Sequence, residues 1–595
     1  MVLITPGIDF IARSFAVLGV AVATAAGVGS LLASRGIVLS TWSLALGVVL
    51  GLPLLAALRI IKTEISHRRH AAALGSRMVP RAQGAMIGNI DILKSMMENW
   101  RSGYPGDGLF DLVEARGPVV NIRVLWSDLL FTASPEHIKT ILATDFNNYV
   151  KGERFHHTMA SVLGTGVFNS DGDMWKFHRS ITRPIFTRDR ISHFELFDKH
   201  ADVVIGHIKN RMRSGDAIDF QDLMARFTLD SATEFMFGSC VHSLSANIPY
   251  PHNASYIPPQ TMSARSAAAN DFSRAFLDAQ EIIAGRERRG WVWPLGEIFK
   301  DATTEPMKVV NSYIDPIIRD AIQKKQHSPP KEKSVESEIG EDETLLDHLI
   351  EITSDPRVLK DEVLNIMIAG RDTTAATLTF IFYFLSLYPD ITVRLREEIL
   401  AKVGPTRRPD YDDIRDMKYL RAVINETLRL YPIVPFNVRE SVHAATWPSS
   451  DPMEKPYYIP AGTKTAYSVF MMHRRKDLWG PDAEEFDPDR FLDDRLKKYL
   501  VKNSFIFLPF NAGPRICLGQ QFAYNEMSFM IIRLLQNFSS VKMDLDATPV
   551  DAFPPKAWAG ASGRKGIEKV YPRMHLTMYA HGGLWLKMQE TESGN

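Results

Sequence analysis

The stretch "FNAGPRICLG", Phe510 to Gly519, decides the fold, because it places one of the chain's two cysteines in a loop crowded with glycine, proline and arginine. A thiolate is a good metal ligand, whereas a neutral thiol is a poor one. The apolar periodicity predicts a helix from about Leu518 to Asn537, and the positive end of this helix would favour the thiolate of Cys517. The loop therefore predicts a metal-binding thiolate.

Each neighbour of Cys517 has a physical role in such a loop. Gly513 permits a tight bulge that brings the loop close to a flat ligand, and Gly519 removes a side chain where the helix would meet that ligand. Arg515 supplies a cation that can bind a carboxylate through two hydrogen bonds. The other cysteine, Cys240 in "SATEFMFGSC", lacks these surroundings, and we interpret it as a small buried hydrophobic residue.

The pattern F-x-x-G-x-R-x-C-x-G resembles the haem-binding loop of the cytochrome P450 superfamily. All of its defined positions match, at Phe510, Gly513, Arg515, Cys517 and Gly519. The resemblance implies that the cofactor is haem b (iron protoporphyrin IX) and that Cys517 is the axial ligand of its iron. It extends over about residues 91–580, where further motifs follow in the family's order.

The segment "ETLR" places Glu426 and Arg429 on one face of a helix. Most such pairs are solvated ion pairs, so the segment alone is a weak signal. Further along, Arg490 in "FDPDRF" resembles the family's P-E-R-F motif, with Asp489 in place of glutamate. The resemblance implies that Glu426, Arg429 and Arg490 form a buried structural network, in which losing one partner would cost about 3–5 kcal/mol.

A long apolar helix, predicted to be buried through the middle of the domain, contains "AGRDTT" (Ala369–Thr374). Gly370 in a helix interior costs about 1 kcal/mol relative to alanine, and a local opening of the helix would explain it. The segment resembles the family's oxygen-binding motif, which implies that Thr373 offers a hydroxyl to dioxygen and that Asp372 relays protons. A kinked helix with a surface acid is the ordinary alternative.

Two further segments resemble the family's contacts to the haem propionates. "MWKFHR" places Trp175 and Arg179 on one helical face, and "VPFNVRES" places Arg439 on a strand. Alone, a Trp/Arg pair is more often a stacking contact at a surface. The resemblance implies that Arg179, Arg439 and Arg515 converge with Trp175 on the two carboxylates of the haem.

Composition and charge narrow the classes of function. The 595 residues carry 69 basic and 69 acidic side chains, which gives no indication of a nucleic-acid partner. Two cysteines cannot form a disulfide framework, a four-cysteine zinc site or an iron–sulfur cluster. We therefore expect the catalytic part to lie in a reducing compartment.

The N-terminal region contains two uncharged stretches, Ser14–Ser34 and Gly36–Leu58. Each approaches the length of about 20 residues with which a helix crosses about 30 Å of hydrocarbon. One span and a two-span hairpin both satisfy the pattern. A signal peptide is the alternative for the first stretch, but Asp9 and the second stretch speak against it. By the positive-inside rule, the flank stays cytoplasmic because it carries Arg59, Lys62, Arg68, Arg69, Arg77 and Arg81.

We therefore predict a membrane anchor over residues 1–62 and a catalytic domain over residues 63–595, with one or two transmembrane helices. The domain is predicted to be α+β and mainly helical, with paired strands at Val119–Val124 and Asp128–Thr132 and a helix capped by Ser134 that begins at Pro135. A third span from Val363 to Pro389 is the alternative for the buried helix, against which its two charges speak. Residues 327–343 are polar and predicted to be a disordered linker, and residues 247–260 a surface insertion.

The resemblance implies a monooxygenase that inserts one oxygen atom from O₂ into an apolar substrate. Because few residues follow Cys517, we expect the electrons to come from a separate NADPH–cytochrome P450 reductase-type flavoprotein in the endoplasmic reticulum membrane, with the catalytic domain on its cytoplasmic face. "FTLDSATEFMFGS" and "FNNYVKG" resemble fungal membrane-bound members that hydroxylate alkanes and fatty acids, and fungal relatives also oxidise aromatic xenobiotics. Candidate pocket residues are Ala369, Thr373, Val434 and Phe436.

Two other functions remain open at this point. A haem-thiolate isomerase or dehydratase would rearrange a peroxide without O₂ or reductase, although the Asp372–Thr373 pair argues against it. A membrane-tethered haem sensor would bind haem without catalysis. Sequons at Asn253, Asn425 and Asn537 would stay unglycosylated in a cytoplasmic domain.

Overall fold

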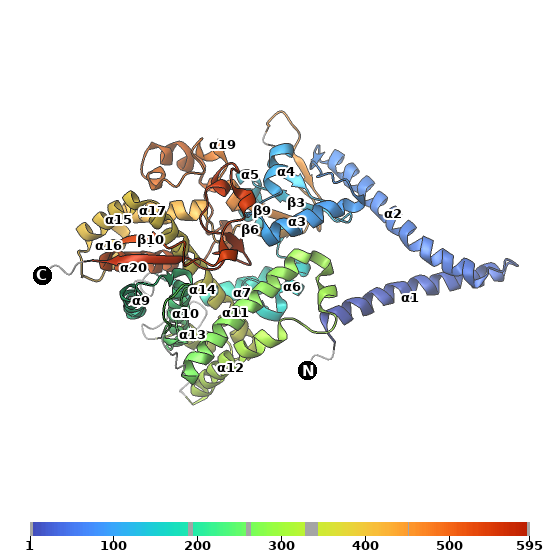
Figure 1. The fold of residues 1–595 in the computed structure, drawn as a ribbon. Helices are drawn as coiled ribbons and strands as arrows, with labels where there is room; N and C mark the ends of the chain where they lie inside the picture. Colours follow the sequence, from blue (N-terminus) through green and yellow to red (C-terminus); the bar gives the residue numbers. More distant parts are fainter. Residues whose placement is uncertain (1–3, 188–193, 258–262, 328–342, 450, 592–595) are drawn as a thin grey trace.

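A computed structural model describes residues 4–187, 194–257, 263–327, 343–449 and 451–591. It confirms the predicted class, because a mainly helical α+β body carries two long N-terminal helices that project from it (Figure 1). Most of the predicted linker, residues 328–342, lies outside the described residues, as do the last three positions of the predicted insertion.

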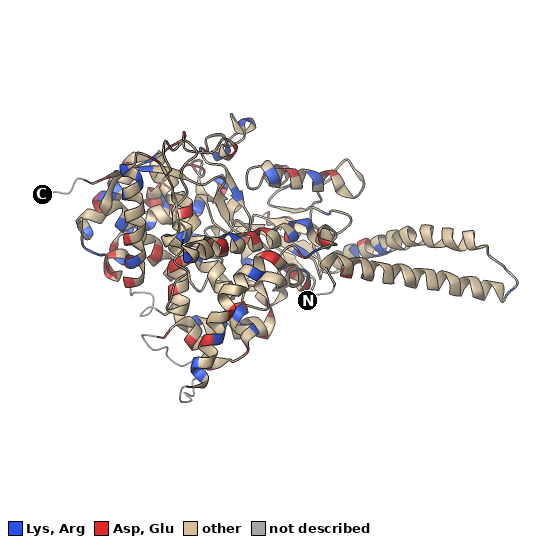
Figure 2. Cartoon of the chain, turned by 60° about the horizontal axis from the view of Figure 1, so that its bottom comes forward, with Lys and Arg blue, Asp and Glu red and all other residues tan. Residues whose placement is uncertain are grey.

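The projecting helices are α1 (Pro6–Ala33) and α2 (Thr41–Ala73). Both are long and apolar enough to cross a membrane. Figure 2 shows them as a hairpin whose charged residues gather mainly near the body. Helix α2 continues past the predicted boundary at residue 62, and Glu64 near its end pairs with Arg81 and Arg123 of the body at 2.6 and 2.9 Å.

The start of α1 also lies against the body. A Cβ atom on Gly7 would come within 2.4 Å of the Ile298 backbone, so only glycine allows this approach. The Phe10 ring lies 6.2 Å from that of Trp291. Both ends of the hairpin therefore meet the same body.

The described part of the body has seventeen α-helices, of which α14 is the central one. They are α3 (Ile90–Ser102), α4 (Leu109–Arg116), α5 (Pro135–Lys139), α6 (Glu153–Leu163), α7 (Gly172–Thr182), α9 (Glu195–Arg213), α10 (Phe220–Phe237), α11 (Ala264–Arg289), α12 (Thr304–Gln326), α13 (Leu345–Ile352), α14 (Pro356–Leu387), α15 (Pro389–Lys402), α16 (Tyr411–Asp416), α17 (Lys418–Leu430), α18 (Val469–Met472), α19 (Lys476–Trp479) and α20 (Gln520–Asn537).

Helix α14 is buried through the body rather than exposed to lipid. It begins at Pro356, after Asp355 accepts a hydrogen bond from the Arg357 N–H group, and most of its residues are buried. The third membrane span, the alternative prediction for this segment, is therefore not what the structure shows.

The predicted opening of this helix at Gly370 is wrong, because α14 is continuous there. The glycine has a packing role instead. Its added Cβ atom would lie 3.3 Å from the Ala232 Cβ of α10, and Thr228 of α10 donates a 2.9 Å hydrogen bond to the Arg371 carbonyl. Gly370 thus lets α10 and α14 approach each other closely.

The strands form small sheets beside the helices. A five-stranded sheet has the order β2 (Val119–Asn121), β3 (Leu129–Thr132), β9 (Lys464–Ser468), β6 (Phe436–Ser441), β4 (Tyr149–Val150). Only β3 and β9 are parallel in it. The other described sheets are β1 (Arg77–Met78), β8 (Tyr457–Ile459), β7 (Ala445–Trp447); β10 (Phe538–Met543), β13 (Trp585–Glu590), β5 (Ile218–Asp219); and β11 (Pro572–Met574), β12 (Met578–Ala580).

The predicted strand pair is confirmed as β2 and β3, although both strands are shorter than predicted. Helix α5 begins at Pro135 as predicted, but Ser134 makes no capping hydrogen bond. Its hydroxyl instead donates to the Glu136 carboxylate at 2.6 Å. The acidic side chain in the first turn competes with the backbone for the serine hydroxyl.

Candidate functional site

The cysteine loop is closed by its own backbone. The Cys517 N–H group donates to the Phe510 carbonyl at 3.1 Å, and α20 begins shortly afterwards at Gln520. Gly513 has a φ angle of +68°, and an added Cβ atom would lie 1.8 Å from the Leu142 carbonyl oxygen. Its close neighbour is thus the segment after α5, so the protein's own packing already requires glycine.

The Cys517 side chain has accessible surface, yet burial raises the pKa of its thiol. A sulfur atom that faces an enclosed space inside the body has both properties. The Gly519 N–H group and the positive charge of Arg179 act in the opposite direction without overcoming burial. The backbone at the start of α20 favours the thiolate in the predicted direction, but burial outweighs it. A metal ion bound to the sulfur would remove the proton outright.

Gly519 leaves room on the same side of the loop. An added Cβ atom would meet only the Phe186 ring, at an ordinary contact distance of 3.5 Å. Unlike Gly513, this glycine is not required by the packing of the described residues.

Helix α7 contacts the cysteine loop. Arg179 donates to the Ile516 carbonyl at 2.9 Å, which ties the helix to the residue before Cys517. The buried Trp175 ring lies 4.6 Å from the Arg515 guanidinium and 5.9 Å from that of Arg179. The structure therefore brings Trp175, Arg179 and Arg515 together, as their motifs predict.

Arg515 already has one carboxylate partner, which the sequence analysis missed. It donates to Asp171 at 2.7 Å and to the Ser170 carbonyl at 2.9 Å, while its Nε–H group has no partner. Burial and the neighbouring Arg439 lower the pKa of Arg515 to about 10. Arg439, on β6, is buried, and in the described chain its guanidinium makes one hydrogen bond, to the Val438 carbonyl at 2.7 Å.

A lysine joins these arginines. Burial, Arg439 and Arg515 hold the pKa of Lys151 well below its usual range. Asp171 acts on both Lys151 and Arg515, and Arg439 adds a further positive charge that disfavours theirs. The sequence signal for Lys151 was its place in "FNNYVKG", shortly before the Trp175 helix, but nothing in its type distinguished it from a surface lysine.

The Glu426 network lies in the same half of the body and is fully buried. Arg429 donates to both carboxylate oxygens of Glu426 at 2.7 and 2.8 Å, and Arg490 lies 3.5 Å from the same carboxylate. Arg490 also pairs with Asp482 at 2.9 Å. The structure thus joins the three residues through ion pairs that have no access to solvent.

One face of α14 is open although the helix is buried. Ile366, Ala369, Gly370 and Thr373 are only partly buried, and their spacing places them on one side of the helix. The Thr373 hydroxyl donates to the Ala369 carbonyl at 2.7 Å, which leaves its lone pairs available. The candidate pocket residues Val434 and Phe436 are also only partly buried.

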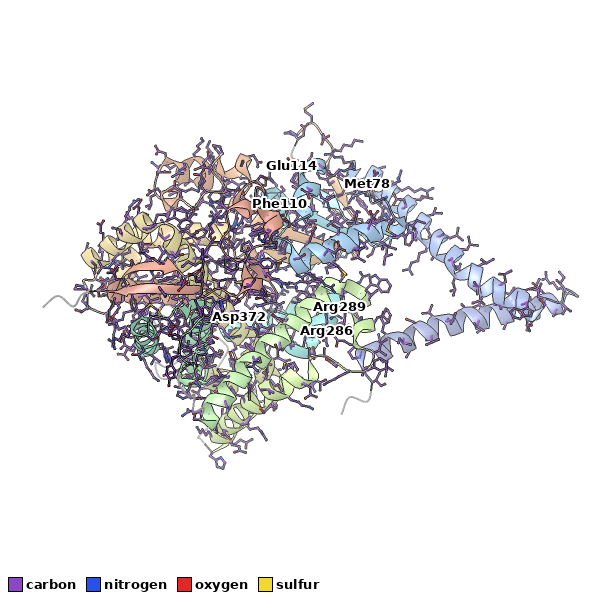
Figure 3. The ribbon with its side chains drawn as sticks, in the orientation of Figure 1. Met78, Phe110, Glu114, Arg286, Arg289 and Asp372 are labelled. Atoms are coloured by element: carbon purple, nitrogen blue, oxygen red, sulfur yellow. The ribbon has the colours of Figure 1, made fainter. Side chains whose placement is uncertain are left out.

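Asp372 lies beside this face and is labelled in Figure 3. One carboxylate oxygen pairs with Arg371 at 3.1 Å, and the other is buried without a hydrogen-bond partner. Burial lowers the pKa of His575, near the tip of the β11–β12 hairpin, to about 4, while the negative charge of Asp372 opposes this shift. The carboxylate is thus held by one neighbour and has one free acceptor.

These residues fit an iron porphyrin. A sulfur atom with accessible surface can ligate the metal, and glycine leaves room beside it. Buried cations in excess of their acidic neighbour can bind two carboxylates. The partly open face of α14 supplies a hydroxyl and small or apolar side chains.

Comparison with known proteins agrees with this arrangement. A family model described as "Cytochrome P450" matches residues 95–558. "Cytochrome P450 52E1" of Candida apicola is 36% identical over 487 residues, which cover 80% of this chain and 86% of the relative. "Cytochrome P450 52-M1" of Starmerella bombicola is 38% identical over 70% of this chain and 76% of its own. "Cytochrome P450 monooxygenase pvhE" of Talaromyces variabilis is 36% identical over 71% and 76%.

Proposed function

Because the chain belongs to the cytochrome P450 family, we propose that it oxidises an apolar substrate (a fatty acid, an alkane or an aromatic xenobiotic) with electrons from a separate NADPH-dependent flavoprotein reductase. As a member of the family it is a haem-thiolate monooxygenase and binds haem b. In the reaction, one atom of O₂ enters a C–H bond, and the other leaves as water after uptake of two electrons and two protons.

The partly open face of α14 carries this proposal. In the middle of a mostly buried helix, Ile366, Ala369, Gly370 and Thr373 are only partly buried and lie on one side. When bound, haem supplies the binding and activation of dioxygen. The candidate pocket residues Val434 and Phe436 are apolar and partly buried, which suits a hydrocarbon.

We assign separate roles to the residues around the haem. Cys517 would hold the iron through its sulfur, and Arg439, Arg515, Arg179 and Lys151 would bind the propionates with Trp175 packed beside them. Phe510, Gly513 and Gly519 would shape the loop, and the Glu426–Arg429–Arg490 network would support it. Thr373 would hold a proton at its hydroxyl, and Asp372 would deliver protons to it from its unpartnered oxygen.

We further propose that residues 1–62 anchor the protein in the endoplasmic reticulum membrane with the body, residues 63–595, on the cytoplasmic face. The two apolar helices and the basic flank after Leu58 support this placement. Because both ends of the hairpin contact the body, a two-span anchor suits the structure. Glycosylation of the exposed Asn253 in microsomes would reverse the orientation.

The decisive experiment is the carbon monoxide difference spectrum of the reduced protein. The holoenzyme should give the spectrum typical of a thiolate ligand, and Cys517→Ala should lose it, whereas Cys240→Ala should keep it. A spectrum of this type that persists in Cys517→Ala would refute the ligand assignment.

Turnover then separates the monooxygenase from the two other functions. Dodecanoic acid should be oxidised with reductase and NADPH; an isomerase or dehydratase would instead consume a peroxide substrate alone, and a sensor neither. Thr373→Ala should retain haem but divert reducing equivalents to hydrogen peroxide, measured as peroxide formed per NADPH. Unchanged coupling would remove Thr373 from proton delivery.

A further inference from the structure

The last turn of α11 carries three nearby arginines, of which one has no acidic partner. Arg286 and Arg289, labelled in Figure 3, pair with Glu297 at 2.6 and 3.9 Å. Arg288, between them, forms no ion pair with any described residue, and neither does Arg573 in β11, which lies near it. Two cations at this place therefore lack a counter-ion.

Arg288 is held firmly nonetheless. One amino group donates to the carbonyls of Met574 and His575 at 2.7 and 2.8 Å, and its guanidinium lies 3.1 Å from the centre of the Trp100 ring of α3. Burial lowers the pKa of Arg288 to about 9, and the positive charge of Arg573 contributes. The charge is thus desolvated and oriented, and a carboxylate close to it would be stabilised.

Glu281, two turns earlier on α11, acts on both arginines. It makes no ion pair with either of them, and burial together with Asp278 raises the pKa of its own carboxyl group. The Tyr579 hydroxyl also faces this group. The positive charge of the pair is therefore not neutralised within the protein.

The pair lies between the anchor and the interior of the body. Trp291, just after Arg288 in the chain, contacts Phe10 at the start of α1, so this end of α11 meets the anchor (Figures 1 and 3). On the other side, the β11–β12 hairpin reaches inward. His575 there senses the charge of Asp372 on α14, and the Met578 N–H group donates to the Ile433 carbonyl at 2.9 Å, beside Val434.

We propose that Arg288 and Arg573 bind the carboxylate of a fatty-acid substrate at the membrane side of the body, with its hydrocarbon tail directed toward Thr373. This inference rests on the proposed function and selects a fatty acid among its substrate classes. A molecule from the bilayer would present its tail to the apolar pocket and leave its head group near the anchor. Oxidation should then fall on carbons remote from the carboxylate.

The test is a titration of the haem-loaded, full-length protein with substrate. Binding is measured from the shift of the Soret band that the substrate induces. Dodecanoate is compared with methyl dodecanoate, which has the same chain without the charge. Arg288→Met and Arg573→Met should each weaken dodecanoate binding about 10–100-fold, the usual effect of losing a hydrogen bond to a charged group. Binding of the ester should change less than about threefold, and Arg288→Lys should restore part of the affinity for the acid.

Arg289→Met is the matched control, because it removes the same charge from the same helical turn at a position that already has an acidic partner. It should leave both titrations unchanged. An equal loss for acid and ester in Arg288→Met and Arg573→Met would mean that these arginines only shape the protein, and unchanged binding of the acid would overturn the proposal directly. Failure of the proposed function looks different, because the wild-type protein would then lack the thiolate-type spectrum.

Discussion

Arg429 and Arg439 are both buried, yet they have opposite surroundings. Arg429 is 0% exposed and meets Glu426 through two hydrogen bonds, whereas Arg439 is 3% exposed and meets one backbone carbonyl. Burying an unpaired charge is costly. By this comparison, Arg429 has its counter-ion within the chain, whereas Arg439 has no acidic partner among the described residues, which fits a role in binding a ligand. Arg288, which is partly buried, likewise has no acidic partner in the described chain.

Removing the acid of the paired region should have the largest effect. Glu426→Ala would leave two buried guanidinium groups, those of Arg429 and Arg490, without their shared carboxylate. We expect a loss of about 3–5 kcal/mol in the free energy of unfolding. Chemical denaturation followed by circular dichroism would measure it.

The control for this change is Asp489→Asn, which removes an exposed partner of Arg394 at 2.8 Å from the same part of the chain. An exposed pair of this kind contributes about 0.2–1 kcal/mol. If both variants lost the same small amount, burial of the Glu426 network would not be what stabilises it.

Glu526 on α20 is a buried acidic residue that can be compared with the buried arginines. Burial raises its pKa from 4.5 to about 8, although the Thr374 hydroxyl acts in the opposite direction. The folded protein therefore keeps a proton that the unfolded chain releases above about pH 5. Stability from this residue should fall by about 1.4 kcal/mol per pH unit as the pH rises toward 8.

Glu526→Gln should abolish that slope, so the variant gains stability relative to the wild type as the pH rises from 5 to 8. Urea unfolding across this range would show the difference. Glu397→Gln, the same change at an exposed position, should run parallel to the wild type. Parallel curves for Glu526→Gln would show that Glu526 is already ionised in the folded protein.

Much of the molecule could be predicted from local patterns. The uncharged N-terminal stretches, the β2–β3 pair, the start of α5 and the buried course of α14 each depend on nearby residues, and the sequence displays them. The cysteine loop was equally clear, because its glycines and its lone thiol have few other physical explanations.

The rest depends on contacts between distant segments. Nothing near Gly370 shows that Ala232 approaches it, and nothing near Cys517 shows that burial outweighs the helix end. Likewise, Arg288 and Arg289 have the same residue type and adjacent positions. Only the fold gives Arg289 a partner and leaves Arg288 without one.

Arg439→Met tests the arginine of the comparison that has no acidic partner, and it should have the smallest effect on stability. Since Arg439 has no acidic partner in the described chain and its charge disfavours those of Lys151 and Arg515, the haem-free protein should lose little stability. The loaded protein should release haem about 10–100-fold faster, because one hydrogen-bonded charge on a propionate is lost. Transfer of haem to an excess of apomyoglobin would measure the rate. Arg429→Met should do the reverse and destabilise the haem-free protein. If the two variants behaved alike in both assays, pairing within the chain would not distinguish ligand-binding arginines from structural ones.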